Sequence, residues 1–402
     1  MTPWRGLINS SYRRFLPLAA ETAAVTLHEG NTPLLHSAYL SQVTGGNVWL
    51  KVEGANPTGS FKDRGMTVAI TQAAADGAEL VICASTGNTS ASAAAYAARA
   101  GIAAAVLIPE SGVAKGKLGQ AVRYGARVVE VTGTFDDCLR IARDLAANHP
   151  VALVNSVGNE LRLSGQRTVA YEIVDTLGAA PDIHCLPVGN GGNITATWQG
   201  YRTYAASSAR DLSAAAPTFS PAPASSPAPT AASAGAEAAS AIAEAASAGA
   251  EAASAAPLPQ ALPRIWGFQA AGAAPFVSGE AVARPQTEAS AIRVGRPATW
   301  APALAARDES GGLIGAVTDE EIFEAYGLIA RHDGVFAEPA SAAGVAGLLK
   351  QHRAGAVPPG ARIVVTLSGN GLKDPDASLR DGLDTAHTGP TTKEVAVVLL
   401  AR

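Results

Sequence analysis

The feature that most constrains this chain is a regular alternation of short apolar runs with longer stretches of helical composition. Runs such as 80–85 (LVICAS) and 103–109 (AAAVLIP) are apolar throughout, and the stretch 89–101 between them (TSASAAAYAARAG) is helical in composition. The same rhythm returns between 318 and 371. Strands that are apolar on both faces and are joined by helices are typical of parallel sheets covered on each side. The sequence therefore predicts an α/β protein of doubly wound parallel sheets.

The length of 402 residues is too great for one compact core and fits two domains of ordinary size. We expect an N-terminal α/β domain over residues 1–160, with a smaller movable part at roughly 70–155. A C-terminal α/β domain is expected over residues 161–402.

One segment breaks the alternation. From Ser207 to Ala256 the chain consists almost entirely of Ala, Ser, Pro, Thr, Gly and Glu, and it repeats SAGAEAASA at Ser233 and Ser247. Such a composition cannot bury enough apolar surface to offset its chain entropy. We expect a solvated insertion at about 207–263 that interrupts the C-terminal domain.

The overall charge excludes some partners. A net charge of -4 gives no general attraction to nucleic acid or to an anionic membrane, so any anion must bind at a local site. The three cysteines have no metal-ligand spacing and lie in apolar or helical contexts, which favours buried free thiols, a reducing compartment and no metal site. No signal pattern and no apolar run of roughly 20 residues is present, so a cytoplasmic protein is expected.

The stretch 56–66 (NPTGSFKDRGM) places one lysine behind a turn and at the start of an expected helix. Ser60 followed by Asp63 resembles a capping box, which would put Lys62 in the first helical turn. The partial positive charge at a helix N-terminus disfavours a protonated amine there. A neutral amine is what Schiff-base chemistry needs. The alternative is a solvated lysine near a helix start, which the local sequence alone favours.

Two glycine-containing loops each follow an expected strand and open an expected helix. Residues 84–92 (ASTGNTSAS) offer hydroxyls, an amide and backbone N–H groups that suit a carboxylate, or they form an ordinary helix start. Residues 188–196 (VGNGGNITA) could close around a phosphate, although the loop is neither a Walker A motif nor a G-x-G-x-x-G motif.

A fourth stretch, 364–374 (VVTLSGNGLKD), ends an expected strand, and its Thr366 can offer a hydroxyl or can be an ordinary strand threonine. Ligands of doubly wound folds bind at the carboxyl ends of strands. The four stretches together therefore predict one ligand site.

In this order, the four stretches resemble the fold-type II pyridoxal-5'-phosphate (PLP) enzymes, and most closely the threonine synthase family. The resemblance extends to 29–36 (EGNTPLLH), 266–279 and 316–350, and it covers nearly the whole chain except 207 to about 263. Its most discriminating piece is 291–300 (AIRVGRPATW). One departure is 155–168 (NSVGNELRLSGQRT), which replaces the more usual Asn-Pro-x-Arg form but keeps an arginine.

The resemblance implies a role for each matching residue. Lys62 would form the Schiff base with PLP beside Phe61, Asn88 would hydrogen-bond the phenolic oxygen of the cofactor, and Thr366 would face its pyridine nitrogen. The remaining matches are the loop for the substrate carboxylate (Ser85, Thr86 and Thr89), the loop for the cofactor phosphate (Gly189, Asn190, Gly191, Gly192 and Asn193) and the candidate cations for the substrate phosphate (Arg162 and Lys117).

Three of these interpretations stay open at this point. Asn190 could face the substrate instead of the cofactor, and Lys117 is equally well explained as a solvated helix residue. Glu338 either faces the pocket or is an ordinary acidic residue at a helix N-terminus.

The family resemblance implies a lyase with PLP in the cleft between two doubly wound domains. Its reaction would convert O-phospho-L-homoserine and water to L-threonine and phosphate, by γ-elimination and β-addition of water, as the last step of threonine biosynthesis. A homodimer is expected on the same ground. The alternatives are a threonine or serine dehydratase of the same fold and a PLP-binding regulatory protein without catalysis.

Overall fold

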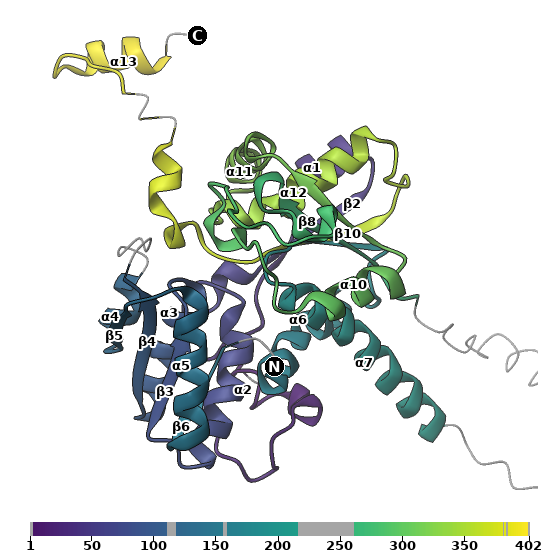
Figure 1. The fold of residues 1–402 in the computed structure, drawn as a ribbon. Helices are drawn as coiled ribbons and strands as arrows, with labels where there is room; N and C mark the ends of the chain where they lie inside the picture. Colours follow the sequence, from purple (N-terminus) through teal and green to yellow (C-terminus); the bar gives the residue numbers. More distant parts are fainter. Residues whose placement is uncertain are drawn as a thin grey trace, which may run out of the picture.

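A computed structural model describes residues 3–110, 118–155, 159–215, 261–380, 382 and 385–400. Two sheets organise this part of the chain, and Figure 1 shows them as an upper and a lower body. Every strand pair is parallel except the one at the edge where the first strand pairs with the second. The prediction of an α/β fold with two parallel-sheet domains is confirmed.

The larger sheet has six strands and brings both ends of the described chain together. Its first two strands come from the N-terminal part, and its third comes from residues near 365. Because β10 lies between β2 and β7, this sheet can form only after most of the chain is available. In spatial order its strands are β1 (Leu34–His36), β2 (Asn47–Val52), β10 (Arg362–Leu367), β7 (Ile183–Pro187), β8 (Arg264–Ala270) and β9 (Leu313–Val317).

Helices cover both faces of the larger sheet, as strands apolar on both sides require. The group above the sheet in Figure 1 consists of α1 (Ala38–Thr44), α11 (Asp319–Asp333) and α12 (Pro339–Arg353). The group below it consists of α6 (Glu160–Leu177), α7 (Gly192–Ala215) and α10 (Trp300–Glu309). Each group forms its own apolar core against the sheet.

The smaller sheet has four parallel strands in the order β5 (Arg127–Val131), β4 (Ala103–Pro109), β3 (Leu80–Ala84) and β6 (Val151–Leu153). One face packs on α2 (Lys62–Ala75), α3 (Asn88–Ala100) and α4 (Gly119–Arg123), and the other packs on α5 (Phe135–Asn148). Many of the buried residues of α3 are alanines, so this helix can lie close to its sheet.

Two details differ from the expected boundaries. β1 and β2 pair into the larger sheet, although they precede residue 160, because their apolar side chains complete the core beside β10. α7 continues to Ala215, past the expected start of the insertion at Ser207, since alanine and serine allow the helix to be prolonged. The rest of the expected insertion, through residue 260, lies outside the described residues.

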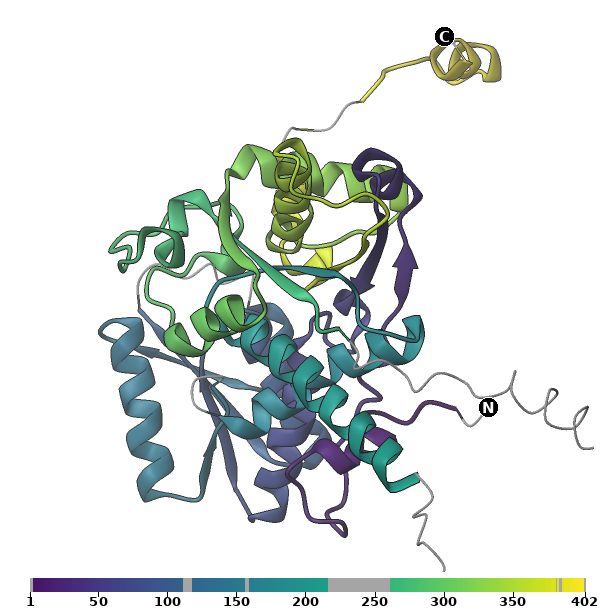
Figure 2. The same cartoon turned by 90° about the vertical axis from the view of Figure 1, so that its right-hand side faces the viewer.

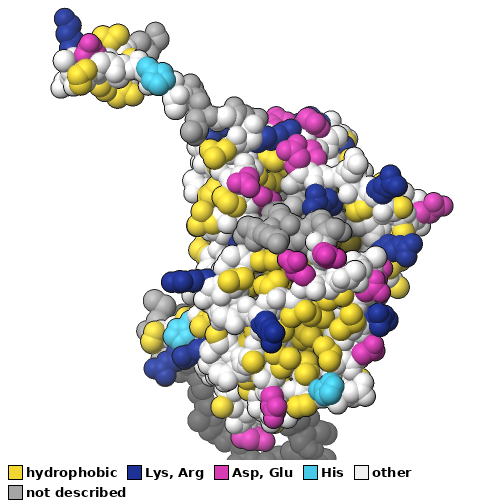
Figure 3. Space-filling view, turned by 60° about the vertical axis from the view of Figure 1, so that its left-hand side comes forward, with side chains coloured by type: hydrophobic (Ala, Val, Ile, Leu, Met, Phe, Trp, Pro, Cys, Tyr) yellow, Lys and Arg dark blue, Asp and Glu magenta, His cyan; other side chains and the backbone are white. Residues whose placement is uncertain are grey.

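The C-terminal helix α13 (Thr392–Leu400) stands away from the body in Figures 1 and 2. Its apolar side chains are exposed, Leu399 and Leu400 most of all. On the face drawn in Figure 3, Lys and Arg side chains are interspersed with Asp and Glu side chains. No helix among the described residues is long and apolar enough to cross a membrane.

Candidate active site

The site is built where α2 and α6 cross. A Cβ atom at Gly65 would overlap the carbonyl oxygen of Arg162, and one at Gly165 would overlap the carbonyl oxygen of Arg64. The two backbones can therefore lie in direct contact only because both positions are glycine. α2 begins at Lys62 and α6 at Glu160, so Lys62 and Arg162 both lie in the first turn of their helices, within a few residues of this contact.

Lys62 is the first residue of α2 and is only partly exposed. Burial and the nearby charge of Arg162 lower the pKa of Lys62 to about 7, and Glu338 opposes this shift. Its Nζ atom lies 4.4 Å from the centre of the Phe61 ring. A substantial fraction of this amine is therefore neutral near pH 7, which is the form that Schiff-base chemistry needs.

The expected capping box does not form. Phe61 occupies the N-cap position and makes no side-chain cap, and the Ser60 hydroxyl is 3.4 Å from the Lys62 nitrogen. The Asp63 carboxylate turns instead to the backbone N–H and hydroxyl of Thr58, at 2.7 and 2.6 Å, and to the Ser92 hydroxyl at 2.6 Å. Asp63 therefore ties the turn that carries the lysine to helix α3 of the smaller domain.

The loop between β3 and α3 lies beside this lysine helix. Ser85, Thr86 and Asn88 are partly exposed, and Thr89 is buried in the first turn of α3. Asn155 fixes the start of the loop, since its side chain accepts from the Ala84 N–H and donates to the Ala84 carbonyl, both at 2.9 Å. The loop keeps partly exposed hydroxyls at a helix N-terminus, which suits a carboxylate.

One hydrogen-bonded contact joins the two domains at this point. The Asn88 amide nitrogen donates to both carboxylate oxygens of Glu338, at 3.2 Å each. The Ser368 hydroxyl lies 3.4 Å from one of these oxygens, and the Phe61 N–H donates to the Ser368 carbonyl at 3.0 Å. We call this place, where Lys62, Asn88, Glu338 and Ser368 meet, the interdomain junction.

The structure does not bring Thr366 to the interdomain junction. Its hydroxyl is buried inside β10, 2.7 Å from the Nε2 atom of His184, and the other ring nitrogen of His184 is 2.9 Å from the Tyr201 hydroxyl. Burial lowers the pKa of His184 to about 3, so the ring is neutral in this chain of contacts. Because β10 continues to Leu367, the first hydroxyl beyond its end belongs to Ser368.

The glycine loop from Gly189 to Asn193 follows β7, the neighbour of β10, and therefore lies at the same edge of the larger sheet. Gly191 has φ +84°, and a Cβ there would lie 2.8 Å from the Thr299 carbonyl oxygen. The Asn190 side chain accepts from the Ala298 N–H at 2.7 Å, so the 291–300 stretch holds this loop.

Next to Gly192 the space is open, since a Cβ atom built there would meet nothing within 4 Å. The buried amide nitrogen of Asn193 has no hydrogen-bond partner among the described residues. The backbone N–H groups of the first turn of the 24-residue helix α7 point toward the same end of the helix, and such a helix start together with this amide suits an anion.

Arg162 is fully buried at the start of α6. One nitrogen, Nη1, donates to the Val154 carbonyl, whereas Nε and Nη2 have no partner within the described part of the chain. Burial lowers the pKa of Arg162 to about 10, which leaves it charged at neutral pH. A buried guanidinium with free donors suits a phosphate that it can bind with two nitrogens. The other predicted cation, Lys117, lies outside the described residues.

Sequence reasoning missed two residues of this site. Ser368 offers the hydroxyl that was expected from Thr366. It can be chosen over Thr366 only when the end of β10, at Leu367, is known. Lys373 is half-way buried behind Thr58, where Nζ donates to the Thr58 carbonyl at 2.8 Å and to Gln120 Oε1 at 2.6 Å. Its place in the GLKD stretch was the available signal, because the resemblance included that stretch.

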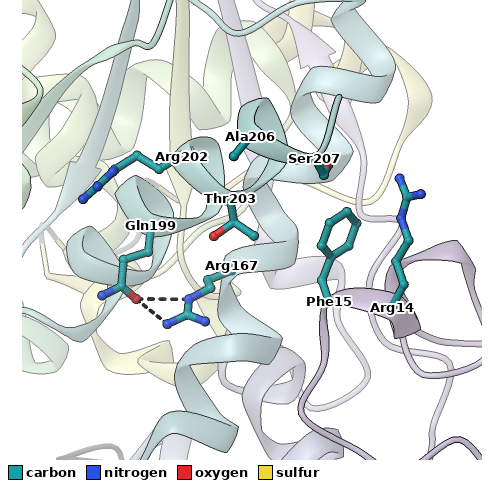
Figure 4. Close-up of a pocket in the computed structure, with 8 residues that line it drawn as sticks. All are labelled: Arg14, Phe15, Arg167, Gln199, Arg202, Thr203, Ala206 and Ser207. Carbon is teal, nitrogen blue, oxygen red and sulfur yellow. Dashed lines mark hydrogen bonds between the residues drawn. The ribbon is translucent and has the colours of Figure 1, made fainter. Parts of the chain in front are cut away.

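A cavity of about 670 Å³ lies between the N-terminal segment and helices α6 and α7. None of the predicted site residues lines it. Figure 4 shows that its arginines diverge, and two of them have acidic partners, since Arg167 pairs with Glu160 and Arg202 with Glu309. This cavity therefore has no group of converging donors for a ligand.

Comparisons with known proteins agree with the geometry. The model of a family described as "Pyridoxal-phosphate dependent enzyme" matches residues 25–258 and 230–369. The threonine synthase of Mycobacterium leprae is 50% identical over 380 residues, which cover 94% of this chain and 91% of the relative. That of Synechocystis sp. is 48% identical over 388 residues, covering 96% and 88%. A crystal structure of O-ureido-L-serine synthase shares the fold, with a TM-score of 0.65, 20% identity and coverage of 92% and 98%.

Proposed function

This chain belongs to the threonine synthase family of pyridoxal-phosphate-dependent enzymes, and we propose that the interdomain junction is where it converts O-phospho-L-homoserine and water to L-threonine and phosphate. The observation that carries this proposal is that two basic groups lie near each other. One is Lys62, whose pKa is near 7, and the other is the guanidinium of Arg162, which lacks partners for two of its nitrogens among the described residues. The first group suits cofactor attachment and proton transfer, and the second suits a substrate phosphate.

The residues present fit the cofactor. The amine of Lys62 would attach it beside Phe61, and the loop from Gly189 to Asn193 would hold its phosphate at the start of α7, where an amide nitrogen and open space await an anion. Asn88 would meet its phenolic oxygen. We assign the contact with its pyridine nitrogen to Ser368 instead of Thr366, because the Thr366 hydroxyl is used by His184.

The chain's own groups divide the work. When bound, PLP supplies an electron sink for the negative charge that develops on the substrate carbon atoms. Once the substrate's amino group has replaced it at the cofactor, Lys62 Nζ would take a proton from Cα and then one from Cβ of the substrate. It would return a proton to Cγ when the phosphate has left and to Cα when water has added. Ser85, Thr86 and Thr89 would orient the substrate carboxylate at the start of α3. Arg162 would bind the γ-phosphate and stabilise its charge as it leaves, after which water adds at Cβ.

A product assay tests this proposal. Purified protein with PLP and O-phosphohomoserine should release phosphate and threonine in equal amounts. Formation of 2-oxobutanoate from threonine as the main activity would instead support the dehydratase alternative. Lys62→Ala should lose the visible absorbance of attached cofactor, and persistence of that band would place the attachment on another lysine.

We also propose a homodimer that works in the cytoplasm. The family resemblance supports the dimer. All three cysteines are buried free thiols, as the sequence predicted, and this agrees with a reducing compartment. Sedimentation velocity at two protein concentrations would give the mass of the species in solution, and a monomer at both would exclude the dimer.

A further inference from the structure

Glu338 precedes α12 but does not cap that helix with its side chain. Its backbone N–H donates to the Gly369 carbonyl at 2.9 Å, and the preceding Ala337 pairs with Asn370 in an isolated bridge. These backbone contacts attach the residue to the loop that leaves β10. The carboxylate is 4% exposed, so it lies inside the interdomain junction and not in solvent.

The position of this carboxylate explains one glycine. A Cβ atom at Gly369 would overlap the carboxylate of Glu338. The Gly369 N–H donates to the Ser341 hydroxyl at 2.9 Å, and the Ser341 and Ser368 hydroxyls are 3.0 Å apart. The loop after β10 is therefore shaped around the Glu338 side chain and the two serines.

A carboxylate only accepts hydrogen bonds when ionised, and this fixes the direction of its partners. Asn88 must turn its NH₂ group toward Glu338, which it does at 3.2 Å to each oxygen. Ser368 lies on the same carboxylate, with its hydroxyl 3.4 Å from Oε1. A single acid thus contacts both side chains that are assigned to polar atoms of the cofactor ring, its phenolic oxygen and its pyridine nitrogen.

The charge of Glu338 acts on the cations around it. It interacts with the ammonium groups of Lys62 and Lys373, and it opposes the effect of Arg162 on Lys62. Asp63 also acts on Lys373. Among the described residues, Glu338 is the acid whose charge raises the pKa of Lys62 and so opposes the effect of Arg162.

We propose that Glu338 is a positioning residue of this enzyme, which orients the Asn88 amide and the Ser368 hydroxyl for the cofactor and balances the charge of Lys62. This inference rests on the proposed function for the identity of the cofactor, and it adds a residue whose action passes through Asn88, Ser368 and Lys62. Glu338 orients the groups that touch the cofactor and is not itself assigned to the reacting atoms.

The test uses Glu338→Gln and Glu338→Ala, with Glu324→Gln as the control because Glu324 is an exposed carboxylate on α11. The first readout is PLP binding to the apo-protein, followed by its visible absorbance. We expect affinity roughly tenfold weaker in Glu338→Gln, because a glutamine amide can no longer fix the Asn88 amide in one direction. The control should bind PLP as the wild type does.

The second readout needs no cofactor. The pH dependence of Lys62 acetylation, measured on its peptide by mass spectrometry, reports the titration of the amine. In both Glu338 variants the midpoint should move to lower pH, which a purely structural defect would not produce. Unchanged PLP affinity together with an unchanged midpoint in Glu338→Gln would overturn the proposal.

The two proposals fail in different ways. If wild-type protein releases no phosphate from O-phosphohomoserine while Glu338→Gln still weakens PLP binding, the substrate assignment is wrong and the role of Glu338 stands. If Glu338→Ala does not fold, Glu338→Gln, which keeps the side-chain volume, decides the outcome.

Discussion

Two buried arginines lie on either side of the contact between α2 and α6, and they are used in opposite ways. All three guanidinium nitrogens of Arg64 are hydrogen-bonded, to Glu53, Glu172, Thr32 and Thr168, over distances of 2.6–3.1 Å. Within the part of the chain that the structure describes, Arg162 has one such bond, and its other two nitrogens have no partner. A saturated guanidinium stabilises the fold, whereas an unsaturated one still has donors that an anion could accept from.

The residues around Arg64 are also hydrogen-bonded to one another, which adds to its difference from Arg162. Glu172 also accepts from Lys51 at 2.7 Å, and the neighbouring Thr32 donates to Glu53 at 2.7 Å. Although burial alone would raise it, the charges of Arg64 and Lys51 lower the pKa of Glu172 to about 2. This network therefore joins α2, α6 and the loop before β1 without leaving a group for a ligand.

The largest expected effect comes from removing Arg64, the fully hydrogen-bonded arginine. Arg64→Leu leaves Glu53 and Glu172 without their main partner, and breaking a buried ion pair in this way costs about 3–5 kcal/mol. Urea unfolding of the apo-protein should show this loss, or the variant should fail to fold. Equal stability of Arg64→Leu and wild type would show that Arg64 is not the centre of the network.

Arg162→Leu is the matched substitution at the arginine whose hydrogen bonds are incomplete. We expect kcat/KM for O-phosphohomoserine to fall roughly 100- to 1,000-fold, as when one charge-stabilising donor is removed, with little loss of stability in urea. Inorganic phosphate should raise the unfolding midpoint of the wild type but not that of the variant. A large loss of stability without loss of activity would place Arg162 with Arg64 as a structural residue.

The smallest effect concerns the pH dependence of Lys62. Its pKa is about 7 in the folded protein against a usual 10.5, so the unfolded chain binds more protons between these values and the contribution of Lys62 to stability rises with pH across that range. Arg162→Leu removes a neighbouring positive charge and should move the midpoint of Lys62 acetylation upward. In Arg64→Lys, which keeps the charge of the other arginine, we expect no movement.

The fold was largely predictable because each strand is a short apolar run that can be recognised from its own residues. Runs such as LVICAS became β3, and the helices between them cover the sheets as expected. Local sequence carries no information on pairing between remote strands, and so it did not show that β2 lies beside β10. Because this pairing could not be seen, the sequence analysis assigned β1 and β2 to the N-terminal domain.

The site residues were predictable by type and less so by position. Lys62 and Asn88 follow turns that define their places, and both lie at the junction. Thr366 and Ser368 are both hydroxyl residues near the end of one strand. They differ because β10 ends at Leu367, so that Thr366 lies inside the strand and Ser368 lies beyond it. The buried state of Arg162 follows from a helix crossing that no local pattern reveals.

The contact between Gly65 and Gly165 also limits how the two helices can change. Because backbone lies against backbone there, any side chain at either position would push α2 and α6 apart. The first turns that carry Lys62 and Arg162 would then move with their helices. The relative placement of these two residues therefore depends on two positions that carry no side chain.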